Sequence, residues 1–202
     1  MIQAILNDWS NYWFAPQSQR RVLSVRLAVM VVATIWIASF WPSLSAWFGP
    51  QGILARPIAA RMIELEELPR WQMWSPLWIA DSLVVYRSWL LIGIALSLLT
   101  ACGIGQRWTI AGLILWMIAW SHRCSWLISV TEPALVAFTA YFLIEPGPKL
   151  ITLLRPNPDG ERESNASNWT AGTVLRLLQT HWWILMAAGL FSQLASFISV
   201  SY

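Results

Sequence analysis

The residues of this chain that could do chemistry are few, and they lie near the ends of long apolar segments. His122 and Arg123 close one such segment, and Glu132 opens the next. A histidine changes charge near neutral pH, so it can carry a proton or donate a hydrogen bond beside a carboxylate. We therefore take His122 as a candidate catalytic acid or base and Glu132 as the carboxylate that orients it. The competing interpretation is a His-Arg pair solvated by lipid headgroups.

Four further ionisable residues are candidate ligand-binding groups. Arg123 and Arg87 carry the charge needed to anchor an anion, and Asp81 lies close to Arg87 in the sequence. Arg26 lies about one turn inside another apolar segment. It either extends its long side chain to the membrane surface or faces the bundle interior and holds an anionic group or a carboxylate partner. No spacing of His, Cys, Asp and Glu is typical of metal ligands, so no metal site is expected.

The elements that must position these residues are five apolar stretches, at about 22–41, 84–104, 108–126, 130–144 and 172–200. A run of about 18 apolar residues or more is typical of a helix that crosses a membrane. The chain is 57% hydrophobic and 11% charged, against roughly 25% charged residues in soluble domains. We expect an all-α, polytopic transmembrane bundle of about five spans with short interfacial helices. The fourth stretch is short for a span, so we expect a break or a tilt near Thr131.

The chain divides around these spans into four parts: an amphipathic lead-in at 1–21, a four-span core at 22–144, a flexible loop at 145–171 and a fifth transmembrane helix at 172–202. Residues 57–68 have the pattern of a helix lying on the membrane. The second and third spans are joined by a few residues, so they form an antiparallel hairpin. Three serines in the last span predict a helix-packing face: Ser192, Ser196 and Ser199.

Charge and aromatic residues predict how the chain lies in the membrane. More lysines and arginines flank one side of the spans, which predicts a cytoplasmic N-terminus and a C-terminus outside. This orientation brings His122, Glu132 and their charged neighbours to the outer end. The chain has 16 tryptophans, typical of interfacial belts, with an aromatic cofactor cage as the alternative. The net charge of +3 comes without a basic cluster, so the expected partner is membrane lipid and not nucleic acid.

Three motifs together resemble the HTTM domain family, the membrane domain related to vitamin K-dependent gamma-carboxylase. An Arg-Leu pair (Arg26-Leu27) opens the first span, and a Trp-Phe-Gly-Pro-Gln-Gly-Ile-Leu corner (Trp47–Leu54) follows it. His122-Arg123 then precedes the acidic Glu132. The resemblance covers about residues 10–150 and implies a helical bundle whose working face lies on the outer side of the membrane.

The resemblance also implies a cofactor class. The carboxylase branch uses reduced vitamin K, oxygen and carbon dioxide, with a lysine as base and an assisting histidine, to which His122 corresponds by approximate position. The lysine has no counterpart, because the chain's one lysine is Lys149, in the loop after the fourth span. We therefore expect a membrane protein with an outer polar pocket for a quinone or lipid-like ligand. The alternative is a non-catalytic membrane subunit or assembly factor of a larger complex.

Overall fold

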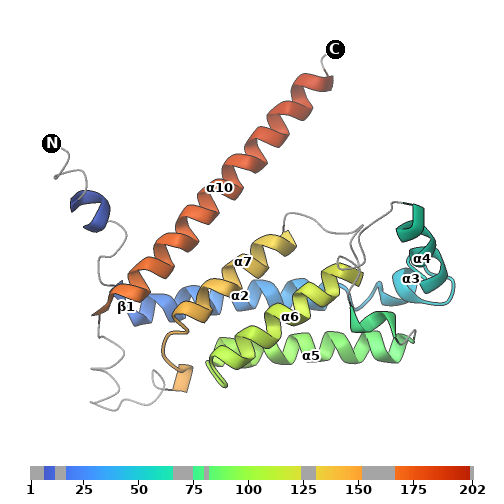
Figure 1. Cartoon of the computed structure of the whole chain (residues 1–202), viewed down its shortest axis with the longest axis horizontal. Helices are drawn as coiled ribbons and strands as arrows, with labels where there is room; N and C mark the ends of the chain where they lie inside the picture. Colours follow the sequence, from blue (N-terminus) through green and yellow to red (C-terminus); the bar gives the residue numbers. More distant parts are fainter. Residues whose placement is uncertain are drawn as a thin grey trace.

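The structure, a computed structural model, describes residues 7–11, 17–65, 75–79, 82–123, 131–151 and 167–200. Within these ranges the fold is α-helical apart from one two-residue strand pair, so the predicted all-α class is confirmed (Figure 1). Four helices form the body of the molecule: α2 (Gln19–Ser39), α5 (Leu83–Cys102), α6 (Arg107–Arg123) and α7 (Thr131–Ile144). The fifth long helix is α10 (Trp169–Val200). The described part of the connection between α2 and α5 contains the short helices α3 (Leu44–Phe48) and α4 (Arg56–Leu65) and the 3-10 helix η2 (Pro76–Trp78).

Two of the described helices, α2 and α5, are long and apolar enough to cross a membrane. They have 21 and 20 residues, so each is about 30 Å long, close to the thickness of a bilayer's hydrocarbon core. Helix α7 is apolar but has 14 residues, which makes it about 21 Å long and agrees with the expected short fourth stretch. Length and composition therefore support membrane association for α2 and α5, and the five spans remain a prediction.

Local sequence signals explain where the body helices begin and end. The Ser82 side chain caps α5 by accepting a hydrogen bond from the backbone nitrogen of Val85 at 3.3 Å. Gly103 ends α5 with φ at 72°, a left-handed conformation that glycine adopts without steric cost. Pro133 lies in the first turn of α7, where its missing N–H group would have had no helical partner.

The four body helices alternate in direction. Helix α2 packs on α5, α5 on α6, and α6 on α7. Hydrogen bonds join Trp116 to Trp89 and Arg123 to Tyr86, so later residues of α6 meet earlier residues of α5. This confirms the antiparallel hairpin. We call the end of the bundle where α2 begins and α5 and α7 finish the Arg26 end, and the opposite end the Arg123 end.

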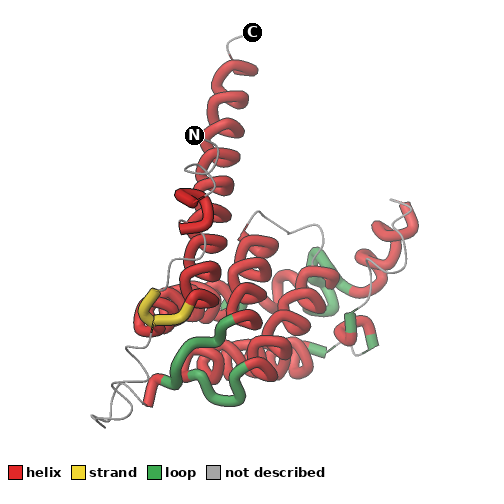
Figure 2. The backbone as a smooth tube through the Cα atoms, turned by 60° about the vertical axis from the view of Figure 1, so that its left-hand side comes forward, coloured by secondary structure: helices red, strands yellow, loops and turns green. Residues whose placement is uncertain are grey.

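A strand pair fixes where α10 starts. Strand β1 (Gln17–Ser18) pairs antiparallel with β2 (Ser167–Asn168). Because β1 directly precedes α2 and β2 directly precedes α10, both helices start at the Arg26 end. Helix α10 packs on α7 and α2, and its C-terminal half extends beyond the other helices (Figures 1 and 2).

A row of stacked indole rings forms the core between α5 and α6. The ring of Trp116 stacks on Trp120 at a centroid distance of 5.8 Å and on Trp89 at 6.3 Å. The indole nitrogen of Trp116 donates to the Trp89 carbonyl oxygen at 2.8 Å. This packing needs Gly93 on α5, because a Cβ atom there would lie 2.5 Å from the Trp116 ring.

The tryptophans therefore serve two purposes. Trp9 and Trp108 are 62% and 87% exposed, as an interfacial belt requires. Trp116 and Trp120 are buried inside the bundle. The exposed, interfacial tryptophans were predicted from the sequence, and the buried ones were not.

Candidate functional site

At the Arg123 end, the last residue of α6 binds three segments together. Arg123 is fully buried. Its Nε donates to the hydroxyl oxygen of Tyr86 on α5 at 3.0 Å, and its Nη2 donates to the carbonyl oxygen of Leu54 at 2.8 Å. Hydrogen bonds from a charged donor contribute about 1.5–3 kcal/mol each. Arg123 therefore holds the α2–α5 connection against the hairpin of α5 and α6.

Aromatic rings enclose this guanidinium. Its carbon Cζ lies 4.5 Å from the ring centroid of Trp78, 5.2 Å from that of Phe48 and 5.7 Å from that of Tyr86. Phe48 and Tyr86 also stack on each other at 4.6 Å. A desolvated cation over an aromatic ring gains about 2 kcal/mol. The rings thus offset part of the cost of burying a charge.

Three buried N–H groups in this cluster lack an acceptor among the residues that the structure describes. They are Nη1 of Arg123, Nε1 of Trp78 and Nε1 of Trp120. Trp120 belongs to the same cluster because its ring lies 5.5 Å from that of Phe48. Buried polar groups in folded proteins are nearly always paired, and each unpaired group calls for an explanation such as an ordered water, an ion or a functional role. We call Arg123, Trp78 and Trp120 the donor cluster.

The corner after α2 (Trp47–Leu54) contacts the donor cluster. Two glycines make it compact: a Cβ atom at Gly49 would lie 2.4 Å from the Ser45 carbonyl oxygen, and one at Gly52 would lie 2.6 Å from that of Trp47. The compact turn presents the Phe48 ring and the Leu54 carbonyl group to Arg123. Two of the three motifs that resemble the HTTM family, the corner and the His-Arg pair, therefore touch each other.

The other candidates at this end have different surroundings. Glu132 is buried at the start of α7, and His122 is half-buried next to Arg123. Both have interaction partners in the structure. Arg87 directly follows Tyr86 on α5 and is exposed. Asp81 lies outside the described residues, so its predicted role remains a prediction.

Arg26 lies at the other end and faces the interior, where it is fully buried. Its guanidinium donates to the carbonyl oxygens of Pro146 and, at 2.8 Å, Pro148, both in the loop after α7. A longer bond of 3.4 Å reaches the carbonyl oxygen of Ala101 near the end of α5, where a helix presents unpaired carbonyl groups. Of the two interpretations made from the sequence, the interior-facing one holds, and the groups that Arg26 contacts are backbone carbonyls.

The two buried arginines cannot share one small ligand. Arg123 contacts Tyr86 and Arg26 contacts Ala101, both on α5. These residues are separated by about 22 Å along the helix at 1.5 Å per residue. The predicted ligand-binding residues thus divide between opposite ends of the bundle.

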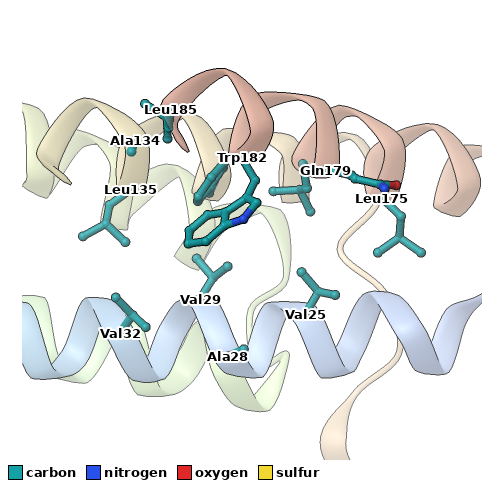
Figure 3. Close-up of a pocket in the computed structure, with 12 residues that line it drawn as sticks. Val25, Ala28, Val29, Val32, Ala134, Leu135, Leu175, Gln179, Trp182 and Leu185 are labelled. Atoms are coloured by element: carbon teal, nitrogen blue, oxygen red, sulfur yellow. The ribbon is translucent and has the colours of Figure 1, made fainter. Parts of the chain in front are cut away.

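An apolar groove of about 570 Å³ lies between α2, α7 and α10 (Figure 3). Of its twelve lining residues only Gln179 is polar. Val25, Ala28, Val29 and Val32 form one wall, and the Trp182 side chain reaches from α10 toward them (Figure 3). The groove could not be predicted from the sequence, because its lining residues are mostly apolar and no periodic pattern marks a gap between helices.

Helix α10 carries a histidine and the three predicted serines. His181 packs on α7, where its Nδ1 lies 3.2 Å from the Tyr141 hydroxyl oxygen and Phe138 meets its ring edge-on. Ser192, Ser196 and Ser199 belong to the helical part of α10 whose side chains lie outside the description, so the predicted packing face remains a prediction.

Comparison with known proteins gave no match to any protein-family model, to any curated protein or to any solved structure.

Proposed function

We propose that this chain is a multi-pass membrane protein of the HTTM type that binds a quinone or a similar carbonyl-bearing lipid at the Arg123 end. The observation that carries the proposal is the donor cluster, whose three buried N–H groups have no acceptor within the described part of the chain. A quinone offers two carbonyl oxygens to such donors. Its flat ring can stack on aromatic side chains, and its isoprenoid tail is soluble in the bilayer.

The proposed membrane arrangement has five crossings, with the Arg26 end in the cytoplasm and the Arg123 end outside. Support comes from the alternating directions of α2, α5, α6 and α7, which return the chain to the side where α2 began. The pairing of β1 with β2 then starts α10 on that side. The excess of lysine and arginine at that side supports its placement in the cytoplasm.

Saturable binding of a short-chain ubiquinone analogue to the detergent-solubilised protein tests the proposal. Trp78→Phe keeps an aromatic ring beside Arg123 and removes one donor, so it should weaken binding about fivefold, the equivalent of one neutral hydrogen bond. Trp108→Phe is the matched control, because Trp108 is exposed and lies at the Arg26 end. Unsaturable partitioning in the wild type, or equal affinity in all three proteins, would contradict the proposal.

The acid–base roles of His122 and Glu132 remain part of the proposal. Both residues lie at the Arg123 end, at the junction of α6 and α7. His122→Ala and Glu132→Ala should each slow oxidation of the reduced (quinol) form of the analogue, with oxygen as the electron acceptor, while the analogue still binds. Unchanged rates in both variants would limit the protein to binding.

A second candidate, a non-catalytic subunit or assembly factor, is favoured by α10. Trp183 and Ile184 are largely exposed, and the helix extends past the bundle (Figure 2). Such a surface suits contact with a partner's transmembrane helices as well as with lipid. Stoichiometric copurification with a larger membrane complex, without bound quinone, would support this candidate over the first.

A further inference from the structure

The apolar groove between α2, α7 and α10 is separate from the donor cluster. It is lined by Val25 and Leu175 toward the Arg26 end and extends to Val32 and Leu185 (Figure 3). Val32 and Trp182 are each about half exposed, at 52% and 54%, so the groove is open along one side. In the membrane orientation of the proposed function, that side faces the acyl chains of the bilayer.

The lining of this open groove favours an apolar occupant. Water has few polar partners there, because Gln179 is the one polar residue among the lining residues. A hydrocarbon chain from the surrounding lipid would cover the apolar walls.

Two cations lie at the Arg26 end of the groove. Arg21 precedes Val25 by one turn on the groove face of α2 and is exposed. On α10, Arg176 donates from Nη1 to Oε1 of Gln179 at 3.3 Å, so its charge lies beside the groove's one polar residue. Basic groups between membrane helices on the cytoplasmic side attract anionic lipid headgroups.

We propose that this groove binds one acyl chain of an anionic phospholipid, whose phosphate group lies against Arg21 and Arg176. The inference takes its membrane orientation from the proposed function but concerns a different site and a different ligand. The lipid would fill the space between α10 and the bundle and hold the start of α10 against α2.

Native mass spectrometry of the protein released from nanodiscs of phosphatidylethanolamine and phosphatidylglycerol tests the proposal. The wild type should retain one phosphatidylglycerol molecule in preference to phosphatidylethanolamine. Ala28→Phe fills the groove and should abolish this retention. Ala38→Phe is the control, because it makes the same change at an exposed position of α2 outside the groove.

The headgroup contact has its own variants, which leave the groove wall intact. Arg21→Gln and Arg176→Gln should each lower phosphatidylglycerol retention about fivefold, and Arg56→Gln, at an exposed position of the opposite end, should leave it unchanged. Equal retention in Ala28→Phe and Ala38→Phe would overturn the proposal, as would equal retention of both lipids by the wild type. Loss of a dimer in Ala28→Phe, without loss of lipid, would instead assign the groove to a second copy of the chain. Quinone binding should survive Ala28→Phe, so the two proposals fail independently.

Discussion

At the scale of single residues, two buried arginines hold the two ends of the bundle. Each donates to backbone carbonyl groups that come from distant parts of the sequence. The guanidinium of Arg26 donates to backbone carbonyl groups, whereas that of Arg123 also lies among three aromatic rings. For this reason the proposed quinone site is placed at Arg123 and not at Arg26.

Tyr86→Phe should destabilise the protein by about 1–3 kcal/mol, because it removes the acceptor of a buried, charged donor and keeps the ring that stacks on Phe48. Tyr141→Phe is a matched control. It removes a half-buried hydroxyl group that bonds to His181, and its cost should be smaller, about 0.5–1.5 kcal/mol. Unfolding in detergent, followed by tryptophan fluorescence, measures both. An equal or smaller effect of Tyr86→Phe would contradict the role given to the Arg123–Tyr86 bond.

At the scale of elements, the α5–α6 hairpin depends on one close approach. Gly93 lets the Trp116 ring lie against the backbone of α5, and this contact starts the stacked row that continues to Trp120. The row leads toward the donor cluster through Trp120 and Phe48. Packing between α5 and α6 therefore also positions the candidate site.

Gly93→Ala should destabilise the protein by about 1–3 kcal/mol, because the new methyl group would overlap the Trp116 ring. Gly112→Ala on α6 makes the same change where the nearest side-chain atom would be 3.4 Å away. It should be neutral or stabilise the helix by up to about 1 kcal/mol. The two midpoints of thermal unfolding decide the matter, and a Gly93→Ala protein as stable as Gly112→Ala would show that α5 and α6 do not pack as described.

The bounds of the helices could be predicted from the sequence more closely than the contacts of their side chains. Hydrophobic runs placed α5 and α7 within two residues at each end, since helix length follows directly from an uninterrupted apolar sequence. The partners of Arg123 come from four segments: Leu54, Phe48, Trp78 and Tyr86. No periodicity links such segments, so the sequence could indicate that Arg123 matters but not what it binds. Tyr86 had one usable signal, since a tyrosine inside an apolar helix needs a partner for its hydroxyl group.

At the scale of the whole molecule, the bundle has two chemically different ends. The Arg26 end contains the strand pair, Arg26 and the cations near the groove, and the Arg123 end contains the donor cluster. If both proposals hold, one ligand site lies toward each side of the bilayer.

The proposed orientation predicts opposite labelling of two exposed positions, Gln51 at the Arg123 end and Lys149 at the Arg26 end. In a chain with Cys102 and Cys124 replaced by serine, Gln51→Cys should react with a membrane-impermeant maleimide on intact cells. Lys149→Cys should react only after the membrane is opened. Labelling of both positions from the same side would contradict the odd number of crossings between them.

The most direct test of the donor cluster is a cryo-electron microscopy structure of the wild-type protein in nanodiscs that contain the ubiquinone analogue. The account predicts density for the quinone ring among the aromatic side chains, with an oxygen atom about 3 Å from Nη1 of Arg123. It would be contradicted if Nη1 of Arg123 and Nε1 of Trp78 and Trp120 were all bonded to groups of the protein itself and no quinone density lay beside them.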